Sequence, residues 1–264
     1  MRSWTKACCA LAVIGLTACS ASPTGRNQLL LFSSQDMTSL GDQSFSQMKQ
    51  EVPINQDAKT NAYVQCVANA ITRQIPKQSG FDNWEVVVFN SDEVNAFALP
   101  GGKIGVYSGL LKVAVNEDQL ATVLGHEVSH VLANHSNERL SQTQLANVGM
   151  QITDVAIGST QYAQYKEATM AALGLGVQYG VILPYGRSQE SEADIVGLEL
   201  MAKAGFDPKQ SIELWKNMDK ASGGGQPPEL LSTHPSHNTR IKDLTAKIQS
   251  MPAFSTPRPN CGSA

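Results

Sequence analysis

His126-Glu127-Val128-Ser129-His130 is the stretch around which this chain of 264 residues is organised. Apolar residues on both sides of it recur at helical spacing, which predicts one helix from an N-cap at Asn116 to about Asn137. Residues four apart share one face of a helix, so His126 and His130 can direct ring nitrogens at one metal ion. The glutamate of the stretch lies beside them, where a general base is needed.

Zinc suits such a site because it prefers nitrogen and carboxylate ligands in a tetrahedral arrangement. A hydrolytic zinc has three protein ligands and a fourth position for a water, from which Glu127 would remove a proton. We therefore expect one Zn²⁺ per chain. The alternative is a helix that carries these polar residues by chance, but unpaired histidines inside an apolar helix are costly.

The third metal ligand must come from outside the stretch. One class of metallopeptidase continues the stretch with Gly at 133 and His at 136, but this chain has Ala133 and Ser136. His135 lies about 180° around the helix from His126, so it cannot join the ligands while the helix is intact. We expect His135 at the surface or at a helix cap.

A second predicted helix, over about 188–204, offers acidic side chains for this role. Glu190 and Asp194 are four residues apart, so Glu190 can bind the metal while Asp194 accepts a hydrogen bond from the far nitrogen of a ligand histidine. Glu192 points about 200° away from Glu190 and is less suitable. This acidic pattern is weak when taken alone, because solvated acidic faces are common.

The composition is that of an ordinary globular protein. Hydrophobic residues make up 42% of the chain and charged residues 16%, which excludes a disordered or fibrous chain. The net charge is −3 and no basic stripe is present, so we expect no nucleic-acid partner. One domain is expected over residues 35–251, followed by a C-terminal tail over 252–264.

Residues 1–18 have the layout of an export signal, with Arg2 and Lys6 before an apolar stretch. The apolar stretch is shorter than the roughly 20 residues of a membrane-spanning helix. Its end, Leu16-Thr17-Ala18-Cys19, resembles the bacterial lipobox, which implies that Cys19 is acylated and becomes the new N-terminus. The alternative is an ordinary secretory signal that is cut close by.

Ser20 at the next position, rather than Asp, resembles the pattern that sorts lipoproteins to the outer membrane. We therefore expect the protein on the periplasmic face of the cell envelope, joined to the membrane by its lipid. Residues 19–34 are expected to be a tether, within which Gly25–Leu31 can form a short strand.

Two cysteines remain as free thiols once the leader has been removed and Cys19 is acylated. Cys66 and Cys261 form an even pair in an oxidising compartment, which predicts one disulfide between the tail and an early helix. The alternative is two isolated buried thiols, since sequence alone does not show whether they lie close enough to join.

The other patterns predict a mainly helical α+β fold. A run of β-branched and aromatic residues predicts a strand at 84–89, and 94–107 predicts two more strands around Pro100-Gly101-Gly102. Further helices are expected at 34–50, at 57–75, from Asp207-Pro208 and at 238–250. Residues 141–182 are expected to form a helical hairpin, either as a close-packed core pair or as a membrane-facing lid.

Several motifs resemble, in order, those of the gluzincin-type membrane-associated metallopeptidases. This family includes the HtpX, BepA and LoiP proteases, the CAAX prenyl proteases and the mitochondrial overlapping-activity protease. The resemblance covers roughly residues 57–250 and rests on Asn95–Gly102, Tyr107–Leu111, His126–His130, Glu190–Asp194 and Ser232–Ser236. The order of these motifs is more specific than any one of them.

The resemblance implies a zinc peptidase domain with a small mixed sheet and an active-site helix. His126, His130 and Glu190 would be the zinc ligands and Glu127 the base. It also implies that an edge strand pairs with the extended backbone of misfolded or unassembled envelope proteins. The residues of that strand are Asn95, Ala96, Phe97 and Ala98.

His234 and Arg240 lie in a segment where the family places a His or Arg that stabilises the oxyanion or, in some relatives, covers the zinc as a gate. The alternative is that His234 caps a loop and Arg240 pairs with an acidic helix. A second functional hypothesis follows from the gate: a zinc-bound chaperone or binding module for outer-membrane assembly, in which proteolysis is silenced. The chain has no clear set of membrane spans and no helical-repeat extension, which weakens that hypothesis.

Overall fold

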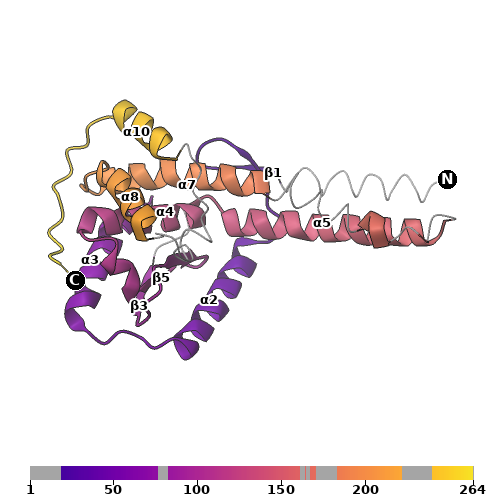
Figure 1. Ribbon diagram of the computed structural model, residues 1–264, viewed down its shortest axis with the longest axis horizontal. Helices are drawn as coiled ribbons and strands as arrows, with labels where there is room; N and C mark the ends of the chain where they lie inside the picture. Colours follow the sequence, from indigo (N-terminus) through magenta and orange to yellow (C-terminus); the bar gives the residue numbers. More distant parts are fainter. Residues whose placement is uncertain are drawn as a thin grey trace. The chain divides into compact units, whose positions relative to one another are not determined.

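The computed structural model describes residues 19–76, 83–160, 164, 167–170, 183–221 and 240–263. The chain divides into two compact units. The first unit consists of Met1–Ser33 and Asn134–Ser188, and the second of Ser34–Ala133 and Gln189–Ala264. The predicted α+β class with a majority of helix is confirmed (Figure 1).

The second unit contains a three-stranded mixed sheet and most of the helices. Its strands are β3 (Glu85–Phe89), β4 (Ala96–Leu99) and β5 (Lys103–Tyr107). β5 lies between the others, parallel to β3 and antiparallel to β4. The helical elements are α2 (Ser34–Glu51), α3 (Ala58–Thr72), η2 (Ser108–Lys112), α4 (Glu117–Leu132), most of α7 (Leu183–Lys203), α8 (Gln210–Ala221) and α10 (Arg240–Ser250).

Two glycines make the turn between β4 and β5. Gly101 and Gly102 have φ values of 87° and 74°, in the left-handed region that glycine occupies without steric cost. A Cβ on Gly102 would also lie 2.5 Å from the carbonyl oxygen of Asn83. The predicted hairpin at this position is confirmed, and it leaves β4 at one edge of the sheet within the described residues.

α4 is buried on every side. The side chain of Asn116 accepts a hydrogen bond from the backbone N–H of Gln119 and caps the helix, as predicted. All residues from Asp118 to Val131 are buried, and the apolar ones pack against α3 and the sheet. A helix that is buried all round is held by its neighbours, so its position depends on theirs.

The predicted extension of this helix to Asn137 is wrong. α4 ends at Leu132, and Asn134 has a φ of 53°, in the left-handed region that asparagine tolerates better than most residues. A new helix, α5 (His135–Gly158), starts directly after it. His135 is 1% exposed, so its predicted place at the surface is also wrong.

α4 and α7 touch backbone to backbone at two glycines. A Cβ on Gly125 would lie 2.8 Å from the carbonyl oxygen of Gly197, and a Cβ on Gly197 would lie 2.7 Å from the backbone nitrogen of His126. Contacts this short leave no room for any side chain. The two glycines therefore permit an approach of the helices that no other residue would allow.

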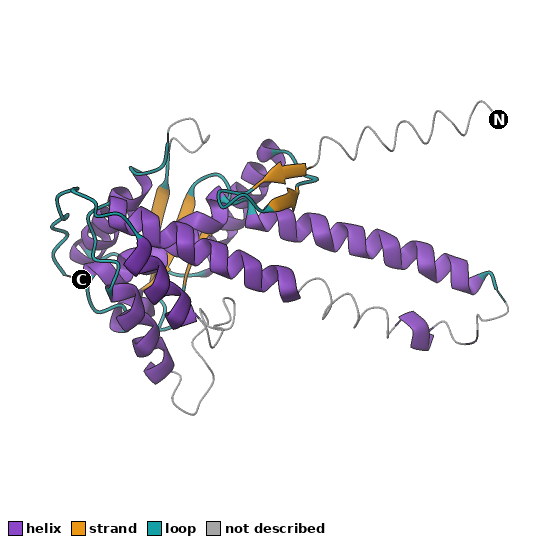
Figure 2. Cartoon of the chain, turned by 90° about the horizontal axis from the view of Figure 1, so that it is seen from above, coloured by secondary structure: helices purple, strands orange, loops and turns teal. Residues whose placement is uncertain are grey.

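The first unit joins an N-terminal hairpin to α5. β1 (Cys19–Ala21) and β2 (Asn27–Leu29) pair in antiparallel fashion beside the start of α5 (Figure 2). The segment predicted as a tether therefore contains ordered strands, one of them within the predicted Gly25–Leu31. α5 supplies the first arm of the predicted helical hairpin, and most of the second arm lies outside the described residues. Among the described helices, none has the length and apolarity to cross a membrane.

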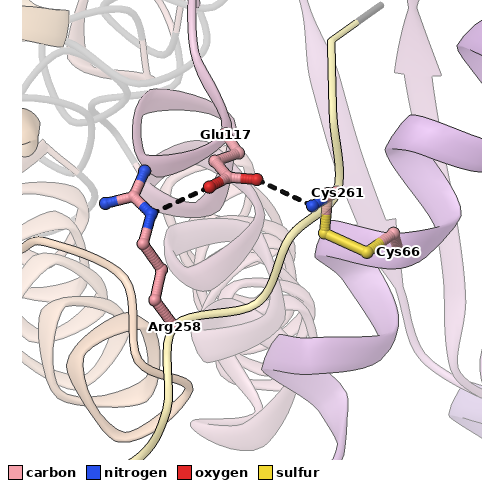
Figure 3. The surroundings of a disulfide bond; sticks show 4 residues. All are labelled: Cys66, Glu117, Arg258 and Cys261. Atoms are coloured by element: carbon pink, nitrogen blue, oxygen red, sulfur yellow. Dashed lines mark hydrogen bonds and ion pairs between the residues drawn. A yellow bond between two sulfur atoms is a disulfide. The ribbon is translucent and has the colours of Figure 1, made fainter.

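The C-terminal tail is fastened to the first turn of α4. Cys66 of α3 and Cys261 form a disulfide, and Glu117 accepts hydrogen bonds from the backbone N–H of Cys261 and from Nε of Arg258 (Figure 3). Arg258 also donates to Asp118 at 2.7 Å. The covalent bond and these contacts connect the tail, α3 and the beginning of α4.

The substitution Gly197→Ala should destabilise the protein by about 1–3 kcal/mol, because the new methyl group would force α4 and α7 apart. The measurement is the free energy of unfolding by chemical denaturation. Gly186→Ala is the matched control: it makes the same change on the same helix, but nothing lies within 4 Å of the new Cβ. Equal stability of the two variants would contradict the proposed close contact.

Cys261→Ser should lower the free energy of unfolding by roughly 2–5 kcal/mol, because the bond closes a loop across 195 residues of sequence. Denaturation curves with and without reductant measure the effect, and reduction should lower the stability of the wild type only. Arg258→Gln is the control, since the Arg258 side chain is half exposed and its ion pairs with Glu117 and Asp118 should contribute about 1 kcal/mol or less. A Cys261→Ser variant as stable as the oxidised wild type would refute the stabilising role.

Candidate metal centre

Three buried side chains converge in the second unit. His126 and His130 project from one face of α4, and Glu190 projects from α7. One ligand atom from each lies within 4.8 Å of the others. The i, i+4 spacing on α4 aligns the two histidines, and the glycine contact between the helices brings Glu190 to them.

The separations of these atoms fit a tetrahedral metal. Nε2 of His126 lies 3.1 Å from Nε2 of His130 and 3.3 Å from Oε2 of Glu190, and Nε2 of His130 lies 3.5 Å from Oε1 of Glu190. Ligands about 2.0–2.1 Å from a zinc ion in tetrahedral geometry would be roughly 3.3 Å from one another. The donor set of two imidazoles and one carboxylate is also one that zinc prefers. The three residues could therefore hold a metal ion.

Asp194 and Arg240 lie on the far side of the His126 ring. Nδ1 of His126 lies 3.0 Å from Oδ1 of Asp194, and Nη2 of Arg240 donates to the same oxygen at 2.6 Å. The guanidinium of Arg240 also stacks on the ring of Trp215, with 3.6 Å from Cζ to the ring centroid. An Nδ1–H bonded to Asp194 leaves the lone pair of Nε2 directed at the other two ligands.

The charges of the site favour a bound cation. Burial lowers the pKa of His126, but hydrogen bonds to Asp194 and Glu190 and their negative charges outweigh burial and raise it to about 9, so a metal ion that binds Nε2 displaces a proton from it. Burial raises the pKa of Asp194, yet Arg240 and His126 hold it below its usual range. Asp194 is thus a carboxylate at neutral pH and can accept the proton of Nδ1 in a hydrogen bond.

The position of Arg240 agrees with one of the two sequence interpretations. Its Nη2 lies 3.8 Å from Oε2 of Glu190 and contacts the Nδ1 side of His126, away from the side on which the ligand atoms meet. The structure thus pairs Arg240 with the acidic helix. His234 lies outside the described residues.

The remaining predicted residues have different placements. Glu127 is buried on α4 next to His126, and Glu192 is buried on α7 outside the group of ligand atoms. Asn95 directly precedes the edge strand β4, which contains Ala96, Phe97 and Ala98. The side-chain oxygen of Asn95 is buried, and no other described residue forms a hydrogen bond with it.

Sequence reasoning missed Trp215 and the glycine pair. The sequence does not single out Trp215 as a site residue, because a tryptophan within a helical pattern is normally interpreted as a core residue. Gly125 and Gly197 did give one: an isolated glycine inside a helical pattern costs about 1 kcal/mol relative to alanine and often marks a close packing contact. Two such glycines next to the metal-ligand motifs could have indicated where the helices cross.

Comparisons with known proteins agree with this geometry. The pattern that defines peptidase family M48 matches residues 58–248. A mitochondrial metalloendopeptidase OMA1 from Schizosaccharomyces pombe is 36% identical over 177 residues, which is 66% of this chain and 50% of that protein. OMA1 from Bos taurus is 33% identical over 251 residues, which is 89% of this chain and 47% of that protein.

A bacterial relative is similar over a comparable length. The beta-barrel assembly-enhancing protease of Escherichia coli is 31% identical over 221 residues, which is 80% of this chain and 44% of that protein. The chain spans about half the length of the curated relatives it matches. The resemblance inferred from the ordered motifs is confirmed. Since the family pattern covers most of the chain and the convergent side chains lie within it, the chain belongs to peptidase family M48.

Proposed function

We propose that this chain is a zinc-dependent endopeptidase that cleaves misfolded or unassembled proteins of the bacterial envelope. The observation that carries the proposal is the convergence of His126, His130 and Glu190 at tetrahedral spacing, with Glu127 next in sequence to the first ligand. Membership of a peptidase family supports the same chemistry.

His126, His130 and Glu190 would bind the zinc, and Glu127 would act first as the general base and then as the general acid. Zinc, when bound, acidifies a water and polarises the carbonyl of the scissile peptide bond. Glu127 accepts a proton from the attacking water and delivers it to the nitrogen of the leaving amine. Burial of Glu127 keeps this carboxylate out of bulk water, which strengthens its interaction with the proton that it transfers.

Asp194 and Arg240 act as positioning residues in this proposal. Asp194 holds the proton on Nδ1 of His126 and so keeps the ring in the tautomer and orientation that ligation needs. Arg240 holds Asp194, and its stacking on Trp215 restrains the plane of the guanidinium.

The edge strand β4 would bind substrate. A strand with one free edge can pair with an extended backbone, and such pairing selects unfolded segments rather than folded domains. Asn95 directly precedes this strand and would belong to the same substrate-binding segment.

An envelope location is part of the proposal. The leader over residues 1–18 and the lipobox-like Leu16–Cys19 support export and acylation of Cys19, and Ser20 supports sorting to the outer membrane. The substrates would then be unfolded proteins on the periplasmic side. A bacterial relative named as a beta-barrel assembly-enhancing protease supports this setting.

Glu127→Gln should lower the rate of casein cleavage by at least about 10²-fold, because it removes the general base. Gln is close in size to Glu and leaves the ligands in place, so the variant should bind one zinc per chain like the wild type. Cleavage rate and zinc content are measured on the same preparation. Equal rates for variant and wild type would refute the proposed chemistry.

Asp194→Asn and Arg240→Gln should each weaken zinc binding about 10–100-fold, since both disturb the orientation of His126. Zinc affinity measured by competition with a chelator is the readout. Lys247→Gln is the matched control: Lys247 lies on α10 like Arg240 and pairs with Glu199 of α7 at 2.6 Å, away from the ligands. If all three variants bound zinc equally well, the positioning roles would have to be abandoned.

A further inference from the structure

Large apolar side chains that face solvent are concentrated in the first unit. Seven of the ten such residues in the described part of the chain belong to it, although it is the smaller unit by described residues. These seven are Leu31, Phe32, Leu140, Leu145, Val148, Ile152 and Val155. A concentration of this kind marks an interaction surface rather than the scattered apolar exposure of an ordinary protein surface.

Four of these side chains form a row along α5. Leu145, Val148, Ile152 and Val155 follow one another at spacings of three or four residues, which places them within roughly 80° of one another around the helix. Their exposed fractions lie between 42% and 72%. We call this row the α5 stripe.

The stripe is not the face through which α5 packs within the protein. The half-buried positions between 142 and 157 lie on another face, centred roughly 150° away from the stripe. They are Gln142, Ala146, Met150, Thr153, Asp154 and Ile157. Asp154 is the one charged residue in the sequence from 140 to 160, and it also lies away from the stripe.

The beginning of α5 is fastened to the segment that starts at Cys19. The buried carboxylate of Glu138 accepts a hydrogen bond from Nη2 of Arg26 at 2.7 Å and one from Gln28 at 3.0 Å. Ser141 accepts a hydrogen bond from the backbone N–H of Leu31 at 2.8 Å. A buried ion pair with these additional bonds resists separation, so the β1–β2 hairpin and the first turns of α5 form one body.

We propose that the α5 stripe lies in the surface of a lipid bilayer. The inference rests on the acylation of Cys19 in the proposed function, which would hold the hairpin, and with it the start of α5, at that surface. A short apolar row binds a membrane weakly by itself, but a lipid chain on the same body supplies the second contact that stable anchoring needs. No Lys or Arg lies between 140 and 160, so the attachment is apolar and independent of anionic lipid.

The test uses the mature acylated chain, which starts at Cys19, on phosphatidylcholine vesicles. Val148→Cys and Thr143→Cys each carry an environment-sensitive fluorophore, and Thr143 is exposed on the side of α5 opposite the stripe. Cys66 and Cys261 are joined and Cys19 is acylated, so the introduced cysteine is the reactive thiol. We expect a blue shift and strong quenching by lipid-borne quenchers at position 148, and an unchanged aqueous signal at 143.

A second variant tests the stripe without altering the anchor. Ile152→Asn combined with Val155→Asn should return the probe at 148 to an aqueous signal, while the chain still floats with the vesicles. Both residues are exposed, so the change should leave folding intact.

Three outcomes would overturn the proposal. A chain that floats while both probes stay aqueous would leave the anchor intact and exclude contact of the stripe with lipid. A probe at 148 that is shielded without vesicles, increasingly with protein concentration, would assign the stripe to a second copy of the chain. Failure of the wild type to float would refute the acylation and the stripe proposal together, whereas cleavage of casein would still test the peptidase chemistry.

Discussion

The contact between Gly125 and Gly197 is the constraint on which the candidate centre depends. His126 and His130 are placed by one helix, but Glu190 belongs to another, and its distance from them is set by how closely the two helices approach. Metal–ligand distances tolerate deviations of about 0.2 Å, which is much less than the thickness of a methyl group. The absence of two side chains in the helix contact is therefore as necessary for the site as the presence of the three ligands.

The close approach also concentrates charge in a buried volume. Glu190 is buried and the side chain of Asp194 is only 11% exposed, so two carboxylates lie where unbalanced charge is costly. Arg240 balances part of it from α10, and His126 lies between the two acids. The carboxylate of Glu190 faces the point where the ligand atoms meet, so a divalent cation bound there would replace the proton of His126 as its counter-charge. The same group of side chains therefore determines both the stability of this region and its ability to bind a metal ion.

Much of the site could be predicted because the relative positions of its residues follow from the geometry of single helices. The i, i+4 geometry identified His126 and His130, the same geometry on a second helix proposed Glu190 and Asp194, and the structure brings all four together. The small sheet and its glycine turn could likewise be predicted, from a run of β-branched and aromatic residues and from Pro100-Gly101-Gly102.

Features that depend on packing between distant segments could not be predicted. The helical pattern continued past Leu132, but a left-handed Asn134 ends α4 there, and tertiary contacts bury His135. The spacing of residues along the sequence gives no indication that Arg240 stacks on Trp215. The hairpin from Cys19 to Leu29 lies in a segment whose composition is that of a linker, and it is ordered by the buried Glu138 far along the chain.

The fastening of the tail to α4 has a consequence for the order of synthesis. A ribosome makes Cys66 and the ligand helix long before Cys261, which follows Cys66 by 195 residues. Glu117 and Asp118 at the start of that helix therefore form their hydrogen bonds with Arg258 only after the tail has been synthesised. In the same way, His126 acquires its contact with Arg240 only after α10 has been synthesised. A nascent chain that already contains every metal ligand still lacks the parts that fix them, so the centre can be completed only late in the making of the protein.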